Sequence, residues 1–310
     1  MPPGGRLGDK AMMSRESGIM KDSHGAETVK RVGSTKVLAF FGLGPEPGRS
    51  SRGAKRLRVF AVMLAFVSAV PGFAAETGGV RSVFEMGSST RYLGMGGAGA
   101  AIADEGSAFL VNPAALAGLR QREASALHAP LFADTRYDAL SYSHPLGKVG
   151  LAAALARTET GDVKRTVQSV VPLYTFDAEQ WQAVLGAGGK VWRGIQLGAS
   201  AKFRRVSIDD RADSGLGIDA GLLYRLHRDG RDLSRFGYRN LSVGFSASNL
   251  VSPEVRLDRS ADRAPLLLRP ALGYRYLTPS MGGAFWVTLE GDLVRQGGNL
   301  LRAGLEYGWH

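Results

Sequence analysis

Three glycines have the spacing of a known chemical motif. Gly94, Gly96 and Gly99 form G-x-G-x-x-G, which in dinucleotide-binding proteins is the turn that holds a pyrophosphate. That chemistry requires a hydrophobic strand before the first glycine and parallel strand–helix units after it. Residues 82–92 are not a hydrophobic strand, and the sequence from about residue 121 alternates as antiparallel strands do. We therefore expect these glycines to permit sharp turns and close backbone packing, and we expect no cofactor.

Residue types that commonly carry catalysis or bind metals are sparse. The sequence has no cysteine, which excludes disulfides, thiolate metal sites and cysteine nucleophiles. After residue 75 the histidines have no second histidine or carboxylate at metal-ligand spacing: His128, His144, His227 and His310. There is no G-x-S-x-G motif, and the sequence does not reveal a Ser/His or Asp/His pair. We expect a protein that is not an enzyme, with a barrel enzyme built on such a pair as an alternative.

One acidic cluster could in principle bind a cation. Asp209, Asp210 and Asp213 lie in an expected loop, where calcium or a cation bridging lipopolysaccharide would be conceivable. Arg211 interrupts the run and the EF-hand pattern is absent. We interpret the cluster as a solvated loop and predict no metal site.

The positive charge of the chain does not indicate a nucleic-acid partner. The formal net charge is +11, but residues 1–75 carry 12 Lys and Arg against 5 Asp and Glu. Residues 76–310 carry 27 against 23, a net charge of +4, with both signs interspersed. A basic face with interleaved aromatic residues is not visible, so we expect no nucleic-acid binding.

Residues 55–75 have the layout of a secretory signal peptide. Lys55, Arg56 and Arg58 precede an apolar run over 59–70, which Pro71 ends before a small-residue cleavage site. The run is too short to span a bilayer as a helix. Residues 1–54 have no sustained period, and we interpret them as a disordered extension or an over-extended translation start. The mature protein is then expected to begin near Ala75 and to work outside the cytoplasm.

Strict alternation of side chains predicts that residues 121–310 are all-β. The faces are inverted: one is apolar, and the other consists of glycine, serine and full charges, as in a transmembrane barrel whose apolar face meets lipid. The segments are longer than most globular strands, and aromatic residues gather near their ends. We predict an antiparallel β-barrel of about ten strands, at 121–129, 134–145, 147–157, 180–191, 194–207, 214–227, 239–250, 266–277, 283–294 and 298–309. A soluble exported β-protein is the alternative.

The connections support this prediction by their lengths. Short turns are expected at 144–148, 192–194 and 278–283, with a longer exception at 227–239. The opposite side carries longer loops, at 158–179, 208–214 and 251–265. Short periplasmic turns opposite longer outer loops are typical of outer-membrane barrels.

The expected lumen would hold charges of both signs. They could line a wet path, but neutralisation of one another inside a narrow barrel is the simpler interpretation. The residues in question are Lys202, Arg204, Asp219, Arg225, Arg275, Glu290, Asp292, Arg302 and Glu306.

Residues 84–119 are the part of the mature chain that does not alternate. They contain Arg91-Tyr92-Leu93-Gly94-Met95-Gly96-Gly97-Ala98, then Ala103-Asp104-Glu105-Gly106-Ser107, then Asn112-Pro113-Ala114-Ala115-Leu116. In this order the motifs resemble the amino-terminal signature of the PorV/PorQ family of outer-membrane proteins and, more distantly, FadL-like barrels for hydrophobic compounds. The likeness continues through segments such as Leu241–Leu250 and Leu301–Trp309.

The resemblance implies that residues 76–120 form a hatch within or under the lumen. The motif positions expected to matter in it are Gly94, Gly96, Gly97, Asp104, Asn112, Pro113 and Ala114. The resemblance also implies location in the outer membrane, contact with its lipid, and a non-enzymatic role in type IX secretion or in transport of apolar small molecules. A plugged barrel that serves as a scaffold for a partner protein is the alternative. Family members usually continue with further strands past the position of Trp309, so we expect a smaller barrel or one that does not close.

Overall fold

The computed structural model describes residues 82–166, 171–226, 240–258, 261–295 and 298–309. The predicted signal peptide and the extension before it lie outside these residues, as do His227 and His310. In the described part no helix is long and apolar enough to cross a membrane.

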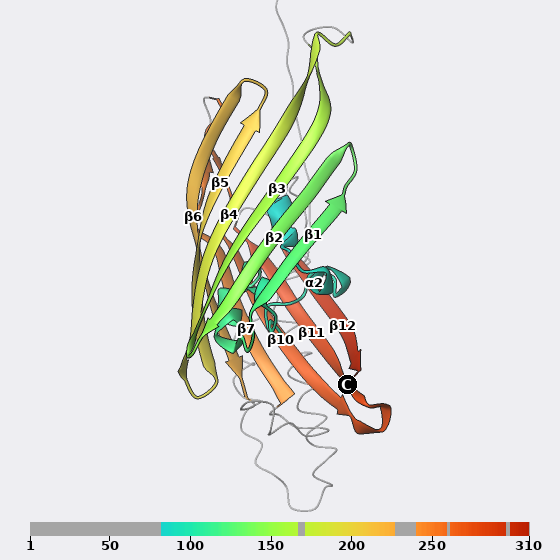
Figure 1. The fold of residues 1–310 in the computed structure, drawn as a ribbon, viewed down its shortest axis with the longest axis vertical. Coiled ribbons are helices and arrows are strands. Elements are labelled where there is room, and N and C mark those ends of the chain that lie inside the picture. Colours follow the sequence, from blue (N-terminus) through green and yellow to red (C-terminus); the bar gives the residue numbers. More distant parts are fainter. Residues whose placement is uncertain (1–81, 167–170, 227–239, 259–260, 296–297, 310) are drawn as a thin grey trace, which may run out of the picture. The chain divides into compact units, whose positions relative to one another are not determined.

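The described chain begins with short helical elements and continues as strands (Figure 1). The helices are η2 (Val83–Met86), α2 (Thr90–Gly94), η3 (Gly106–Leu110), η4 (Pro113–Gly118) and, between two late strands, η6 (Pro279–Met281). The long strands are β1 (Glu123–Pro130), β2 (Thr135–Leu146), β3 (Val149–Arg165), β4 (Tyr174–Trp192), β5 (Ile195–Ile208), β6 (Arg211–Arg225), β7 (Leu241–Val251), β10 (Leu267–Thr278), β11 (Gly283–Val294) and β12 (Leu300–Trp309). A separate small hairpin pairs β8 (Glu254–Val255) with β9 (Asp262–Arg263).

The ten long strands form one antiparallel sheet in the order β1-β2-β3-β4-β5-β6-β7-β10-β11-β12. Each overlaps one of the ten predicted segments, so the predicted all-β antiparallel architecture is confirmed. The predicted barrel is not closed among the described residues, because β1 and β12 each have a single neighbour in the sheet; the sequence had left open whether it closes. Residues 82–120, for which we keep the name hatch as a label only, instead contact both of these edge strands. Arg91 is ion-paired with Glu306 of β12, and Ser125 of β1 donates a hydrogen bond to Ser88.

The prediction of a long loop at 158–179 was wrong over most of that range. β3 continues to Arg165 and β4 already begins at Tyr174. The register between the two strands shifts between Thr160 and Val163, and Asp162 has a φ of 55°. A bulge moves later side chains to the opposite face, so the alternation is lost although the strand continues. The predicted loop at 208–214 is also shorter, because Ile208 pairs directly with Arg211.

Alternation along β5 shows how the sheet divides its side chains. Leu197 and Phe203 are 43% and 42% exposed, whereas Gln196 and Lys202 are 4% and 8% exposed. The same inversion appears on β3 and β4, where leucines are exposed and glycine or alanine is buried between them. We call the face with the buried glycine, serine and charged residues the inner face, and the opposite face the outer face.

The core lies between the inner face and the hatch. Hatch alanines are fully buried, and η4 packs against β3, β4, β5 and β6. Glycines on the strands allow this close approach: a Cβ on Gly221 would overlap the side chain of Asn112, and one on Gly244 would overlap the backbone of Ala100. An apolar contact of Phe109 and Leu116 with Val184 adds to this packing.

Candidate functional site

The predicted Asn112-Pro113-Ala114 motif begins η4 and ties the hatch to the sheet. Asn112 is the N-cap, and its Oδ1 accepts a hydrogen bond from the Ala114 N–H at 3.1 Å. Pro113 follows at the first helical position, where its missing N–H costs no hydrogen bond. The Asn112 Nδ2 donates to the carbonyls of Ala100 at 2.9 Å and Leu222 at 3.2 Å. A single buried amide therefore joins η4, the glycine-rich segment and β6.

The glycines of the G-x-G-x-x-G segment make a turn. Gly94 ends α2, and Gly96 and Gly97 have φ values of +66° and +77°, which favour glycine. A Cβ on Gly97 would lie 2.6 Å from the Arg302 Nη1, and the Gly97 carbonyl accepts a hydrogen bond from that atom at 3.2 Å. These positions have the turn and close-packing role expected from the sequence.

The N–H groups that follow this turn hold a carboxylate of the chain itself. Gly99 and Ala100 donate to the Glu290 Oε2 at 3.0 and 2.9 Å. Glu290 lies on β11 and is fully buried, with Arg269 Nε 3.7 Å from its Oε1. Successive backbone N–H groups bind anions well, and here they neutralise an internal charge. The glycine-rich segment thus binds β11 through these N–H groups. A dinucleotide site would need the same N–H groups to be free.

Asp104 belongs to an ion-pair cluster at the β12 edge. Its carboxylate accepts from the Arg91 Nη1, and the Arg91 Nε and Nη2 reach Glu306 at 2.8 and 2.7 Å. Burial lowers the pKa of Arg91, but the hydrogen bond to Glu306 and the charge of Asp104 outweigh burial and raise the pKa above its usual value. The guanidinium therefore stays charged and holds α2 against β12.

Several of the predicted lumenal charges do neutralise one another. Lys202 Nζ lies 2.7 Å from the Asp219 Oδ1, and Arg302 Nη2 lies 2.8 Å from the Asp292 Oδ2. Arg204 donates to the side chain of Gln180 at 2.8 Å. Arg225 and Arg275 line a separate cavity with Asp104 and Arg120.

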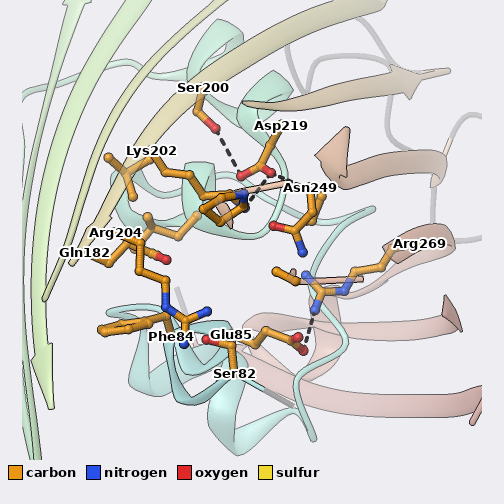
Figure 2. A pocket seen from close by; sticks show the side chains of 15 residues that line it. Ser82, Phe84, Glu85, Gln182, Ser200, Lys202, Arg204, Asp219, Asn249 and Arg269 are labelled. Carbon is orange, nitrogen blue, oxygen red and sulfur yellow. Dashed lines mark hydrogen bonds and ion pairs between the residues drawn. The ribbon is translucent and has the colours of Figure 1, made fainter. Parts of the chain in front are cut away.

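A small cavity lies beside these pairs and is lined by further charged side chains (Figure 2). Its volume is about 50 Å³, which has room for only a few water molecules. Ser200, Lys202 and Asn249 gather around Asp219 on one side, and Arg269 pairs with Glu85 on the other at 3.2 Å.

Arg91 and Arg269 were not among the site residues expected from the sequence. Arg269 is 3% exposed and also reaches Asp292 at 3.1 Å. A signal was present, because Arg269 interrupts an otherwise apolar run at the start of a predicted strand, and a charge there is expected to need a buried partner. Arg91 lies in the hatch, where no alternation indicates which side chains face the sheet.

The structure brings together an Asp/His pair that the sequence did not reveal. His128 of β1 lies directly across from Asp138 of β2, and the His128 Nδ1 is 2.6 Å from the Asp138 Oδ1. Cross-strand register brings them together, which spacing in the sequence does not reveal. The two side chains are 66% and 50% exposed, and they do not line the small cavity. The His144 Nδ1 lies 3.2 Å from the Tyr142 hydroxyl.

The acidic cluster at 209–213 is divided by the turn between β5 and β6. Asp209 accepts from the Arg165 Nη1 at 2.5 Å and from the Tyr174 hydroxyl at 2.7 Å, and Asp213 accepts from the Arg256 N–H at 2.6 Å. Within the described ranges no group of three or more His, Cys, Asp or Glu side chains could hold a metal ion.

Fold and site together describe a β-sheet protein whose charged inner face is bound to an amino-terminal hatch. Residues 72–172, about a third of the chain, match a family described as "Uncharacterised protein family (UPF0164)". The matched region includes the described hatch and strands β1 to β3. No curated protein matches the chain. The resemblance to PorV/PorQ stays a prediction.

Proposed function

We propose that this protein is embedded in the outer membrane, with the outer face of the sheet against lipid. In this proposal it acts without catalysis, in a process associated with secretion or in transport of apolar small molecules. Its partners would be membrane lipid together with secretion-machinery proteins or the transported compounds, and not nucleic acid.

The distribution of apolar side chains is the observation that carries the proposal. Leu185, Leu216 and Leu305 are 67%, 69% and 66% exposed at the middle of their strands, whereas Lys202 and Glu290 are buried. A sheet exposed to water would place such leucines inward and its charges outward. The observed arrangement favours lipid as the solvent of the outer face.

A second candidate function is that of a plugged scaffold for a partner protein. The attachment of the hatch to the inner face of the sheet favours it. Asn112, Arg91 and the N–H groups of Gly99 and Ala100 bind strands far away in the sequence. Opening a path through the inner side would break these buried hydrogen bonds together, which costs several kcal/mol. In this role the protein would present its loops to a partner, and the hatch would keep the inner side filled.

Fractionation of cells that produce the full chain is the first test. We expect the mature protein in the outer-membrane fraction, released only by detergent. Recovery in the soluble periplasmic fraction after mild lysis would contradict membrane embedding and favour a soluble exported β-protein.

A matched pair of lysine substitutions on β4 tests the lipid contact directly. Leu185 lies near the middle of the strand and Val191 near its end, and both side chains are about two-thirds exposed. In a bilayer, Leu185→Lys is expected to lower the free energy of unfolding by about 2–4 kcal/mol and Val191→Lys by only about 0–1 kcal/mol. Urea unfolding from lipid vesicles measures both. Equal, small effects would indicate that β4 faces water.

Flux separates the two candidate roles. Uptake of a labelled apolar compound into vesicles that contain the protein would support transport. Absence of flux, with a partner retained on co-purification from the outer membrane, would support the scaffold.

A further inference from the structure

The apolar side chains of the outer face form a band across β3, β4 and β5 that has a border on each side. At one border, the strand register places Arg157, Trp181 and Arg205 in one row. At the other border, β2 and β3 and also β4 and β5 are joined by tight turns, Gly147-Lys148 and Arg193-Gly194 (lower left in Figure 1). We call this second border the turn end. The outer-face residues between the borders include Leu151, Ala153, Leu155, Ala183, Leu185, Ala187, Leu197, Ala199, Ala201 and Phe203.

The height of this band matches the hydrocarbon core of a membrane. Lys148 and Arg157 are nine positions apart along the chain. With a rise of about 3.3 Å per residue, they lie about 30 Å apart along the strand. At the strand tilt of about 35–45° that is usual in transmembrane barrels, this length corresponds to about 21–25 Å across the membrane, and the apolar band of such barrels is about 25 Å tall. The turn end is therefore expected at the level of lipid headgroups.

The turn end carries positive charge without carboxylates from its own hairpins. Each tight turn contributes one exposed basic side chain, Lys148 in the first and Arg193 in the second. Residues 139–158 and 180–208, which include both turns, contain no Asp or Glu. The basic residues of the two turns thus form a local positive surface beside the apolar band.

The opposite border of the band differs, because both signs of charge occur there as pairs. The Arg157 Nε lies 2.5 Å from the Glu179 Oε1, and the Arg165 Nη1 lies 2.5 Å from the Asp209 Oδ2. The two borders therefore present different charge to the molecules around them.

Aromatic side chains accompany the basic residues of the turn end. Trp192 is 63% exposed, and the Arg193 guanidinium carbon lies 5.7 Å from the centroid of its ring. Tyr142 and Tyr224 are also exposed near this end. Tryptophan and tyrosine are enriched at membrane–water interfaces, where the ring meets apolar chains and its polar group meets water. A guanidinium over such a ring can still donate hydrogen bonds to a phosphate.

We propose that the turn end binds the phosphate groups of anionic phospholipids, with Lys148 and Arg193 as the ligands and Trp192 beside them in the interface. The proposal rests on the proposed function, because it requires the outer face to lie in lipid. It adds the class of headgroup: a positive surface favours a lipid of net negative charge over a zwitterionic one.

Quenching of tryptophan fluorescence by brominated lipids tests this preference. The purified protein is placed in phosphatidylcholine vesicles that contain either brominated phosphatidylglycerol or brominated phosphatidylcholine with the same acyl chains. Subtraction of the signal of Trp192→Phe isolates the emission of Trp192. We expect phosphatidylglycerol to be enriched beside Trp192 by about fivefold or more, because one basic residue at an anionic surface contributes about 1 kcal/mol. High salt should reduce the enrichment.

Substitutions assign the enrichment to the turn end. Lys148→Gln and Arg193→Gln should each reduce it by up to about fivefold, and the double variant should bind both lipids equally. The matched control combines Lys164→Gln with Arg205→Gln, which removes two exposed basic residues beyond the opposite border. This control should keep the enrichment of the wild type.

Two outcomes would overturn the headgroup preference while leaving the outer face in lipid. One is equal quenching of the wild type by the two lipids, and the other is an unchanged enrichment in the double variant. Absence of quenching by either lipid would contradict the proposed function itself, and the headgroup preference with it.

Discussion

Glu290 offers the sharpest test of how the hatch is held. Both backbone donors, Gly99 and Ala100, reach the same atom, Glu290 Oε2. Glu290→Ala removes this acceptor from a site that solvent does not reach. Glu290→Gln keeps one side-chain oxygen in the same position, so the amide can still accept both hydrogen bonds.

The size of the effect follows from the groups left without partners. A buried donor without an acceptor costs about 1–3 kcal/mol, so two such N–H groups cost about 2–6 kcal/mol in Glu290→Ala. At 1.4 kcal/mol for each factor of ten, the lower bound is about a 30-fold change in the local opening equilibrium. Arg269 limits further loss, because it keeps Asp292 and Glu85 as partners. For Glu290→Gln we expect a change of less than about tenfold, since only the charge is lost.

Amide hydrogen exchange of a peptide that covers residues 94–103 measures the opening directly. In Glu290→Ala the exchange of Gly99 and Ala100 should accelerate by at least about 30-fold, with the glutamine variant between the alanine variant and the wild type. Glu179→Ala is the control, because Glu179 forms a part-exposed pair with Arg157 away from the hatch. Exchange in Glu290→Ala within twofold of the wild type would refute the view that this carboxylate holds the glycine-rich segment.

Three further predictions concern the hatch. Gly99→Ala would place a Cβ 2.5 Å from the Tyr92 ring and should destabilise the protein by about 1–3 kcal/mol in thermal melting, whereas Gly94→Ala, with nothing within 4 Å, should melt as the wild type does. Burial, with nearby carboxylates, raises the pKa of Tyr92 well above 10, so the folded state keeps a proton that the unfolded chain loses. The free energy of unfolding should therefore fall as pH rises above about 10. Tyr92→Phe should lack this part of the pH dependence in thermal melts between about pH 8 and 11. Arg91→Lys cannot maintain the two-point contact with Glu306 and should raise amide exchange over residues 87–97 about 10-fold while leaving β4 unchanged; equal exchange in both proteins would contradict an anchoring role.

Much of the sheet could be predicted because the alternation of apolar with small or charged residues along a strand is visible in the sequence. Alternation in residues 194–207 and 283–294 located β5 and β11 to within one residue and placed Lys202 and Glu290 on the inner face. The prediction failed where the period is broken, at the bulge beside Asp162, because one added residue reverses the order of the faces.

The ion pairs of the site could not be predicted to the same degree. His128 and Asp138 meet because β1 and β2 pair in one register, and a shift of one residue would separate them. Arg91 and Glu306 are 215 residues apart, and their contact depends on where the hatch lies against β12.

The G-x-G-x-x-G segment shows most clearly which features the local sequence determines and which the tertiary structure decides. By itself the sequence determined that its glycines permit a turn and that Glu290 shares a face with Asp292, because backbone sterics and strand period act between near neighbours. Only the tertiary structure decided that the Gly99 and Ala100 N–H groups bind Glu290, and that Arg120, Arg225 and Arg275 meet in one cavity. Those contacts join residues about 50 to 190 positions apart, and they depend on strand order, register and hatch placement, which no local pattern encodes.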